Sequence, residues 1–213
     1  MPSPPDGGVL PNQILLVVGY HKGGSGAIAK FLGELARVNG LDFQTSNDGA
    51  KTRLIRGVNF LRNLDFTDLR GFDGRGLHVI RNPMSIVWSA YWSHLESHPT
   101  SGSTFVWREL EDQRNRLQKA TLEEGLWLTV EFLERSNFHE DRPGPLYCLR
   151  QWDFGDPRFH SIRFESGWPE IFKSLVYLEM PERGRLIPPD FSQFEFSALS
   201  GGRNIGDVDS KSH

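Results

Sequence analysis

The feature that most constrains the fold is an apolar run followed directly by a glycine-rich turn and an amphipathic segment. Residues 14–18 are all Ile, Leu or Val, which predicts a strand buried on both faces. Residues 19–26 then contain four glycines. In residues 27–38 the apolar positions recur at helical spacing, and the predicted buried face consists of Ile28, Phe31, Leu32, Leu35 and Val38. This order of elements predicts an α/β fold.

A strand, a glycine turn and a helix in succession are typical of an anion-binding site. Glycines let the backbone approach a ligand, and the first N–H groups of the helix point at it with partial positive charge. Lys22 adds a full charge. The turn is not a Walker A loop, because Ser25 rather than lysine follows Gly24, and G-x-G-x-x-G is absent. The alternative interpretation is an ordinary glycine-rich turn.

Composition sets the class of protein. A chain of 213 residues predicts a single domain (1–213), with a loose leader (1–12) and an irregular tail (200–213). Because the net charge is −3, we expect no nucleic-acid partner, and a bound anion must be held by a local cluster. The single cysteine, Cys148, favours the reducing cytoplasm. No apolar run approaches about 20 residues, so no membrane span is expected. No residue cluster has metal-ligand spacing, so no metal is expected.

A second informative block predicts a strand over residues 77–80, then Arg81, then a helix with Asn82 as N-cap and Pro83 in its first turn. Parallel sheets bind ligands at the carboxyl ends of their strands, which is where Arg81 would lie. Ser89 follows Pro83 on the helix by about 9 Å. A guanidinium and a hydroxyl can clamp one phosphate. The alternatives are a surface ion pair for Arg81 and an ordinary helix surface position for Ser89.

The remaining segments are predicted more coarsely. Residues 41–76 show only weak helical character, and residues 104–135 predict two helices. We expect Arg114 to belong to a solvated charged face of the first of these. Short strands are predicted at 147–149 and 160–164, and a helix at 169–178.

Four blocks, in order, resemble motifs of the PAPS-dependent sulfotransferases, in their bacterial-type and cytosolic forms. The family's first loop is roughly P-K-[ST]-G-[ST]-[ST], and residues 21–26 (His-Lys-Gly-Gly-Ser-Gly) take its place. The second motif is an arginine, then Asn-Pro, with a serine eight positions after the arginine, as in Arg81 and Ser89. The third is a strand ending in Arg-Tyr-Glu-Asp, where Phe164 replaces the tyrosine. The fourth is residues 196–203.

The resemblance implies an α/β fold of the P-loop type, in three layers with a central parallel sheet flanked by helices. It implies 3′-phosphoadenosine 5′-phosphosulfate (PAPS) as donor. The implied donor-binding residues are Lys22, Gly23, Gly24, Ser25, Gly26 and Ala27 for the phosphosulfate, Arg81 and Ser89 for the 3′-phosphate, and Phe164. A sulfuryl group would pass to a hydroxyl or amine of a small-molecule acceptor. Lys22 would be catalytic, stabilising the charge that grows on the bridging oxygen.

The chain also departs from the family. Ala27 stands where many cytosolic members carry an adenine-stacking tryptophan, and the family's Lys-Thr-His segment is missing. The general base that would take the acceptor's proton is therefore not identified, and the candidates are His94 and Asp48. The chain ends at His213, before a Tyr-Arg-x-Gly segment, so we expect a C-terminally shortened member or a 3′-phosphate site built differently.

Two other hypotheses remain at this stage. One is a catalytically impaired sulfotransferase-like protein that binds a nucleotide or a partner and transfers nothing. The other is a P-loop nucleotide kinase, which the missing lysine after Gly24 argues against. The acceptor is not identified, and the oligomeric state is open between a monomer and a homodimer.

Overall fold

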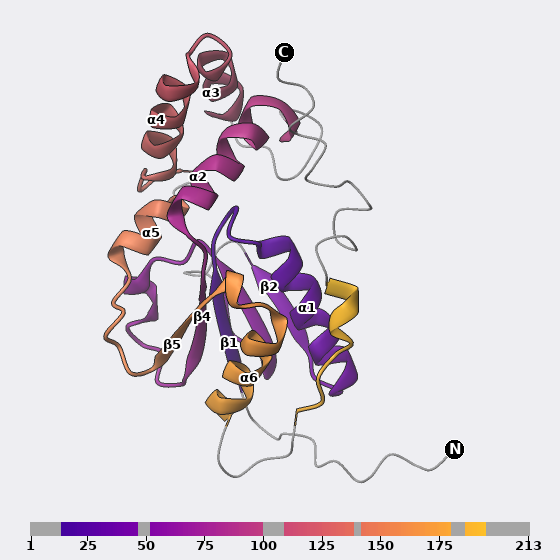
Figure 1. Ribbon diagram of the computed structural model, residues 1–213. Coiled ribbons are helices and arrows are strands. Elements are labelled where there is room, and N and C mark those ends of the chain that lie inside the picture. Colours follow the sequence, from indigo (N-terminus) through magenta and orange to yellow (C-terminus); the bar gives the residue numbers. More distant parts are fainter. Residues whose placement is uncertain (1–13, 47–51, 100–108, 139–141, 180–185, 195–213) are drawn as a thin grey trace.

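The computed structural model describes residues 14–46, 52–99, 109–138, 142–179 and 186–194. Within these, five parallel strands form one sheet in the order β2-β3-β1-β4-β5 (Figure 1). The strands are β1 (Ile14–Gly19), β2 (Phe43–Ser46), β3 (Gly57–Arg62), β4 (Gly76–Ile80) and β5 (Phe159–Arg163). Helices flank the sheet, which confirms the predicted three-layer α/β fold with a central parallel sheet.

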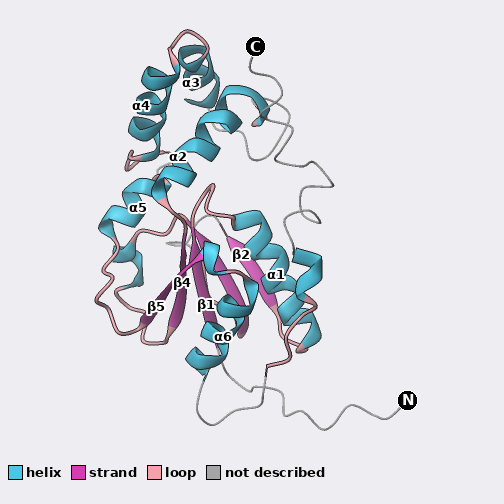
Figure 2. Cartoon of the chain, in the orientation of Figure 1, coloured by secondary structure: helices cyan, strands magenta, loops and turns pink. Residues whose placement is uncertain are grey.

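Six α-helices accompany the sheet in the described part of the chain (Figure 2). They are α1 (Ser25–Val38), α2 (Pro83–Trp92), α3 (Glu109–Leu117), α4 (Leu122–Leu133), α5 (Pro145–Gln151) and α6 (Trp168–Glu179). A π-helical turn, Ser93–Ser97, extends α2, and short 3₁₀ turns cover Phe66–Leu69, Phe164–Ser166 and Phe191–Phe194. Helices α2, α3 and α4 stand beyond the edge of the sheet where β4 ends (Figure 1).

Apolar side chains of β1 point to both faces of the sheet, as the uninterrupted apolar run predicts. Leu15 and Val17 join a core with α1 and α6, whereas Leu16 and Val18 pack with Leu69 and other residues on the opposite face. A third apolar cluster joins α2, α3, α4 and α5. The prediction for α1 is confirmed except at Val38, which is only half-buried.

Two predicted segments were wrong. Residues 41–76, expected to be weakly helical, contain β2 and β3. The strand signal was hidden because β3 buries a polar residue, Asn59, whose amide is satisfied by the backbone of Ile55 and by Gln44. Residues 147–149, expected to be a strand, belong to α5, which begins with Pro145 directly after its N-cap, Gly144.

Other predictions are confirmed. β4 passes into α2 with the Asn82 side chain accepting a hydrogen bond from the N–H of Met84 and Pro83 in the first turn. The two helices expected within 104–135 are α3 and α4, and β5 and α6 lie where expected. The predicted leader, the tail, the block 196–203 and Asp48 lie outside the described residues.

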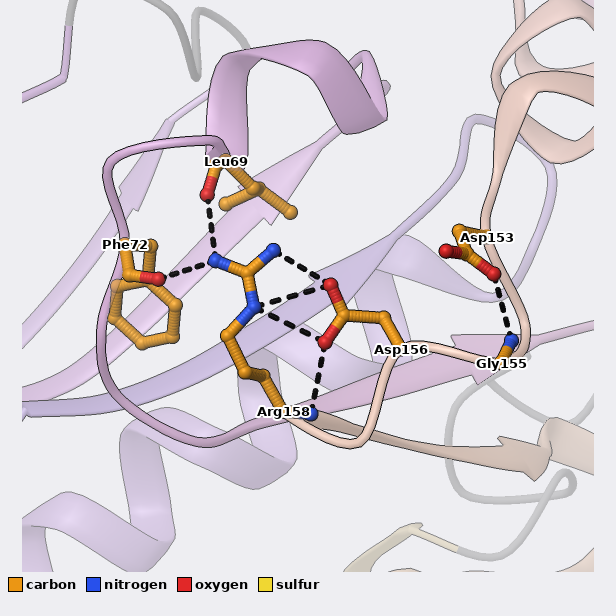
Figure 3. Close-up of polar contacts among 6 residues, drawn as sticks. All are labelled: Leu69, Phe72, Asp153, Gly155, Asp156 and Arg158. Atoms are coloured by element: carbon orange, nitrogen blue, oxygen red, sulfur yellow. Dashed lines mark hydrogen bonds and ion pairs between the residues drawn. The ribbon is translucent and has the colours of Figure 1, made fainter.

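At the amino edge of the sheet, Arg158 fixes β5 against its neighbour (Figure 3). Its guanidinium pairs with Asp156 and donates to the carbonyl oxygens of Leu69 and Phe72, in the segment that precedes β4. The carbonyl of Arg158 in turn accepts a hydrogen bond from the N–H of Gly76, at the start of β4. Both strands therefore begin in register.

The strand order identifies the switch point of the sheet. After β1 the chain turns toward β2 on one side of the sheet, and after β4 it continues toward β5 on the other side. Ligands of open α/β sheets bind at such a switch point, beyond the carboxyl ends of the two adjacent strands. Here that place is occupied by the glycine turn after β1 and by Arg81 after β4.

None of the helices described is long and apolar enough to cross a membrane.

A buried polar chain crosses the sheet below the glycine turn. The Tyr20 hydroxyl lies 2.6 Å from Nε2 of His78, and Nδ1 of His78 lies 3.0 Å from Oγ of Ser161. His78 is fully buried and stacks on Trp152 with ring centroids 3.7 Å apart. Burial lowers the pKa of His78 from its ordinary value of 6.5 to about 3.

The pKa of His78 predicts a pH dependence of stability. Between pH 6.5 and 3 the unfolded chain binds a proton at His78 that the folded chain does not, so the free energy of unfolding falls as the pH is lowered. In urea unfolding from pH 6 to 4, the free energy of unfolding should depend less steeply on pH in the Tyr20→Phe/His78→Leu double variant. The slope should be smaller than in the wild type by about 1.4 kcal/mol per pH unit. Equal slopes in the wild type and the double variant would refute the assignment.

Candidate functional site

The turn after β1 depends on two residues with left-handed backbones. Lys22 has φ 58° and Gly24 has φ 86°. Glycine adopts such a conformation freely, but lysine does so at a cost of about 1–2 kcal/mol. The N–H of Gly23 closes the turn by donating to the carbonyl of Tyr20 over 2.9 Å. A lysine held in this conformation indicates that the surrounding contacts stabilise the turn.

Helix α1 starts inside this turn with its donors uncapped. Gly24 is the N-cap residue, no side chain caps the helix, and the first helical hydrogen bond runs from the N–H of Ile28 to the carbonyl of Gly24 over 2.9 Å. The N–H groups of Ser25, Gly26 and Ala27 precede that bond and have no intrahelical acceptor. The structure thus gathers the predicted residues from Lys22 to Ala27 around one helix N-terminus.

Neighbouring elements hold the turn by three hydrogen bonds. Asn63, just after β3, accepts from the N–H of His21 at 2.8 Å. Arg81, just after β4, donates from Nη1 to the carbonyl of Lys22 at 2.8 Å. Ser93, just after α2, accepts from Nζ of Lys22 at 2.5 Å. Lys22 and Arg81, predicted from separate blocks, therefore lie side by side.

Phe164 also lies at the turn. Its ring packs so closely on Gly24 that a Cβ atom there would be 2.7 Å from the ring, and the ring meets Trp168 edge to face at 5.5 Å. Sequence reasoning missed Glu165, next to Phe164, whose Oε1 accepts from the N–H of Asn82 at 3.1 Å. The same carboxylate oxygen is 4.0 Å from Nε of Arg81, which holds that arginine toward β5.

Ser89 lies on α2, one helical turn before Ser93 and therefore on the same face, and it is half-buried. Since Ser93 contacts Lys22, this face of α2 is directed toward the glycine turn. The described contacts include no hydrogen bond between the Ser89 side chain and Arg81. Their joint action on one phosphate stays a prediction.

His94, a predicted base, is fully buried in the π-helical turn. Its Nε2 lies 3.5 Å from Nε2 of His21, and the two rings stack with centroids 5.7 Å apart. The ring of His98 lies 5.9 Å from His21 and 6.0 Å from His94. Sequence reasoning missed this cluster, although the four-residue spacing of His94 and His98 was a usable signal.

Arg114 was predicted to lie on a solvated face, and this was wrong. It is half-buried and donates to the carbonyl oxygens of His94 at 2.7 Å and His98 at 2.6 Å. Helix α3 thus holds the π-helical turn in place. The i, i+2 pattern of charges could not distinguish this residue from its exposed neighbours.

Burial shapes the charge of the site. Burial lowers the pKa of Lys22 to about 8, so its ammonium form still dominates at neutral pH. The pKa values of His21 and His94 fall well below the ordinary 6.5, first because of burial and then because of the charge on Lys22. Burial also lowers the pKa of Arg62, at the end of β3, and its Nε is buried without a hydrogen-bond partner. The carboxyl edge is therefore cationic although the chain is acidic overall.

In the part of the chain that the structure describes, no group of three or more His, Cys, Asp or Glu side chains is arranged to hold a metal ion. The positively charged groups and amide donors at the turn instead suit an anionic ligand.

No protein-family model matches the chain, and a comparison with curated proteins finds no match. Among solved structures, the chain is similar to mouse sulfotransferase SULT7A1 complexed with PAP, with 13% sequence identity and a TM-score of 0.43. The similarity covers 92% of this chain and 61% of that chain, so this chain spans less than two thirds of that protein's length. At that level of similarity, the site has to be judged from this chain's own residues.

The turn itself can be tested with two glycines. Gly24→Ala places a Cβ atom at positive φ and against the Phe164 ring, so the variant should be less stable by about 1–3 kcal/mol in thermal or urea unfolding. Gly26→Ala is the matched control, because a Cβ there meets nothing within 4 Å. It should keep wild-type stability or gain up to about 1 kcal/mol. If both variants unfold alike, the left-handed turn does not constrain Gly24.

Proposed function

We propose that the chain is a sulfotransferase that takes a sulfuryl group from PAPS and passes it to a hydroxyl or amine of a small-molecule acceptor. The observation that carries the proposal is the contact between the two predicted anion sites. Arg81, at the end of β4, donates to the backbone of the glycine turn at Lys22, over the switch point of the sheet. Two separated anionic groups of one nucleotide need two adjacent cationic sites of this kind.

The phosphosulfate end of the donor fits the glycine turn. The uncapped N–H groups of Ser25, Gly26 and Ala27 and the start of α1 favour an anion. The absence of a side chain on Gly26 leaves space for it, since nothing lies within 4 Å of a Cβ position there. Lys22 supplies the formal charge, and Gly23 and Gly24 shape the turn.

The 3′-phosphate is assigned to Arg81 and Ser89. Arg81 is about one quarter exposed, with 28% of its side chain accessible, so its guanidinium is available to a ligand while one Nη stays bound to the turn. Ser89 lies on the face of α2 that contacts the turn through Ser93. Phe164, packed on Gly24, offers an apolar surface next to both sites for the nucleoside.

The residues in place fit an in-line transfer. As the bond between sulfur and the bridging oxygen breaks, negative charge grows on that oxygen, and the Lys22 ammonium stabilises it. Ser93 accepts a hydrogen bond from Nζ of Lys22 and so orients this ammonium beside the helix start. His94, a predicted base, follows Ser93 in the chain. No step requires a metal ion.

Measurements of nucleotide binding and of turnover distinguish an active sulfotransferase from a catalytically impaired relative and from a kinase. Isothermal titration calorimetry with adenosine 3′,5′-bisphosphate (PAP) should show saturable binding, and ATP with magnesium should bind more weakly. Transfer from PAPS is then measured with a panel of phenols and alcohols. Binding without transfer would support the catalytically impaired relative. Preference for ATP with magnesium would support a kinase. The cytoplasmic location and the oligomeric state stay predictions.

The two cationic residues should fail in different ways. Lys22→Ala should lower kcat by about 10²–10³-fold with PAP affinity changed far less, because Lys22 acts mainly on the transition state. Arg81→Ala should weaken PAP binding by about 10–100-fold, because it removes charge-assisted hydrogen bonds. Lys30→Ala and Arg37→Ala, exposed positions on α1, serve as controls. Unaltered turnover in Lys22→Ala, or unaltered PAP affinity in Arg81→Ala, would count against the respective role.

The pKa of Lys22 predicts the alkaline limit of activity. Because only the ammonium form stabilises the leaving oxygen, kcat should fall as the pH rises through about 8. An aliphatic alcohol is the suitable acceptor, since it does not titrate in this range. In Lys22→Arg the remaining activity should persist to higher pH, because a guanidinium stays protonated. The same alkaline limit in both proteins would exclude Lys22 as its origin.

A further inference from the structure

Three histidines meet where β1, the π-helical turn and α3 come together. His21 is the second residue after β1 and precedes Lys22, so backbone geometry ties its position to that of the proposed catalytic lysine. Its ring is stacked on His94, with an interplanar angle of 20° and the two Nε2 atoms 3.5 Å apart. At that separation the two Nε2 atoms are within reach of a long hydrogen bond, whose donor depends on the tautomers of the two rings. His98 borders both rings, and Phe138 closes the cluster with its ring 5.8 Å from that of His21.

The three histidines differ in access. His94 is fully buried, so its ring does not reach a ligand beside the turn. His21 and His98 are partly exposed. Of these two, only His21 belongs to the glycine turn, whereas His98 lies at the far end of the π-helical turn with its carbonyl bound to Arg114.

The surroundings keep His21 in its basic form. Burial is the main cause that lowers the pKa of His21 well below 6.5. The charged or titratable groups that face it add to this effect: Lys22 on the same turn, His94 and His98 from the π-helical turn and the residue after it, and Arg62 from β3. Arg114 of α3 adds to the positive charge around His94 and His98. A neutral imidazole can accept a proton, and an ammonium beside it can stabilise negative charge.

The geometry points to His21 as the catalytic residue that accepts the acceptor's proton, with His94 as the positioning residue that holds the His21 ring through its Nε2. This inference rests on the proposed function. It replaces His94 as the base, because His94 is fully buried, whereas His21 is partly exposed and belongs to the glycine turn. The backbone of His21 is fixed independently by Asn63, so replacing the side chain leaves the hydrogen bond to Asn63 intact.

In the proposed step, the acceptor O–H gives its proton to the His21 imidazole while its oxygen forms a bond to sulfur. The bond between sulfur and the bridging oxygen breaks, and its electron pair stays on the 5′-phosphate. The Lys22 ammonium stabilises the resulting negative charge. The products are the sulfated acceptor and adenosine 3′,5′-bisphosphate, and the His21 imidazolium releases its proton to water.

The test compares His21→Asn, His94→Asn, His94→Ala and, as a matched control from the same cluster, His98→Asn. PAP affinity is measured first by calorimetry, and then the pH profile of kcat with PAPS and an aliphatic alcohol. His21→Asn should bind PAP within about 3-fold of wild type, lose about 10²–10⁴-fold in kcat, and lose the acidic limb of the profile. His98→Asn should keep kcat and an acidic limb, shifted at most to higher pH because one of the groups that lower the pKa of His21 is removed.

His94 should behave as a positioning residue. His94→Ala should lower kcat by about 10-fold and shift the acidic limb without abolishing it, because His21 remains the proton acceptor. His94→Asn, which keeps a polar partner for the ring, should recover part of that loss. If His94 variants abolish the limb while His21→Asn keeps it, the roles are reversed and the inference fails.

Failure of the inference is distinguishable from failure of the proposed function. A wild-type protein that transfers sulfuryl groups while His21→Asn retains its kcat and acidic limb would overturn the inference alone. A wild-type protein that neither binds PAP nor transfers would overturn the proposed function and the inference together.

Discussion

The site depends on a left-handed turn of the backbone at Lys22 and Gly24, directly after the central strand. A lysine in this conformation is strained, and the strain is offset by contacts from every neighbour: Asn63 after β3, Arg81 after β4, Ser93 after α2 and the Phe164 ring after β5. These contacts hold the start of α1 open to solvent and fix the Lys22 ammonium beside it. The turn thus joins the sheet, the helices beyond its edge and the candidate anion site.

Placement at the switch point explains why an acidic chain presents a cationic site. Positive charge is concentrated where the strands end, because Lys22, Arg62 and Arg81 lie at this edge of the sheet and outnumber the nearby carboxylate of Glu165. The helices α2, α3 and α4 pack around the histidine cluster, and of its three rings His94 is fully buried. Burial lowers the pKa of Lys22 and the pKa of His21, so a charged ammonium and a neutral imidazole stand next to each other in the chain.

The sequence predicted what local signals encode. The apolar run, the glycines and the Asn82-Pro83 pair specify β1, α1 and α2 within a few residues each, and strand-end reasoning placed Arg81 near the turn. It failed for β3, because the buried Asn59 is satisfied by partners that only the fold provides. It also overlooked His21, whose stacking on His94 joins residues 73 positions apart. The pairing of Arg81 with the carbonyl of Lys22 is equally non-local and could not be inferred from spacing.

The central claim is that the glycine turn after β1, together with Arg81, binds a nucleotide carrying two phosphates. The most direct measurement is an NMR titration of the backbone amides with adenosine 3′,5′-bisphosphate, using the assigned wild-type protein. The account predicts saturable shifts that are largest for the amides of Ser25, Gly26 and Ala27, together with the Arg81 side chain. Shifts centred on another surface, or none at millimolar ligand, would contradict it.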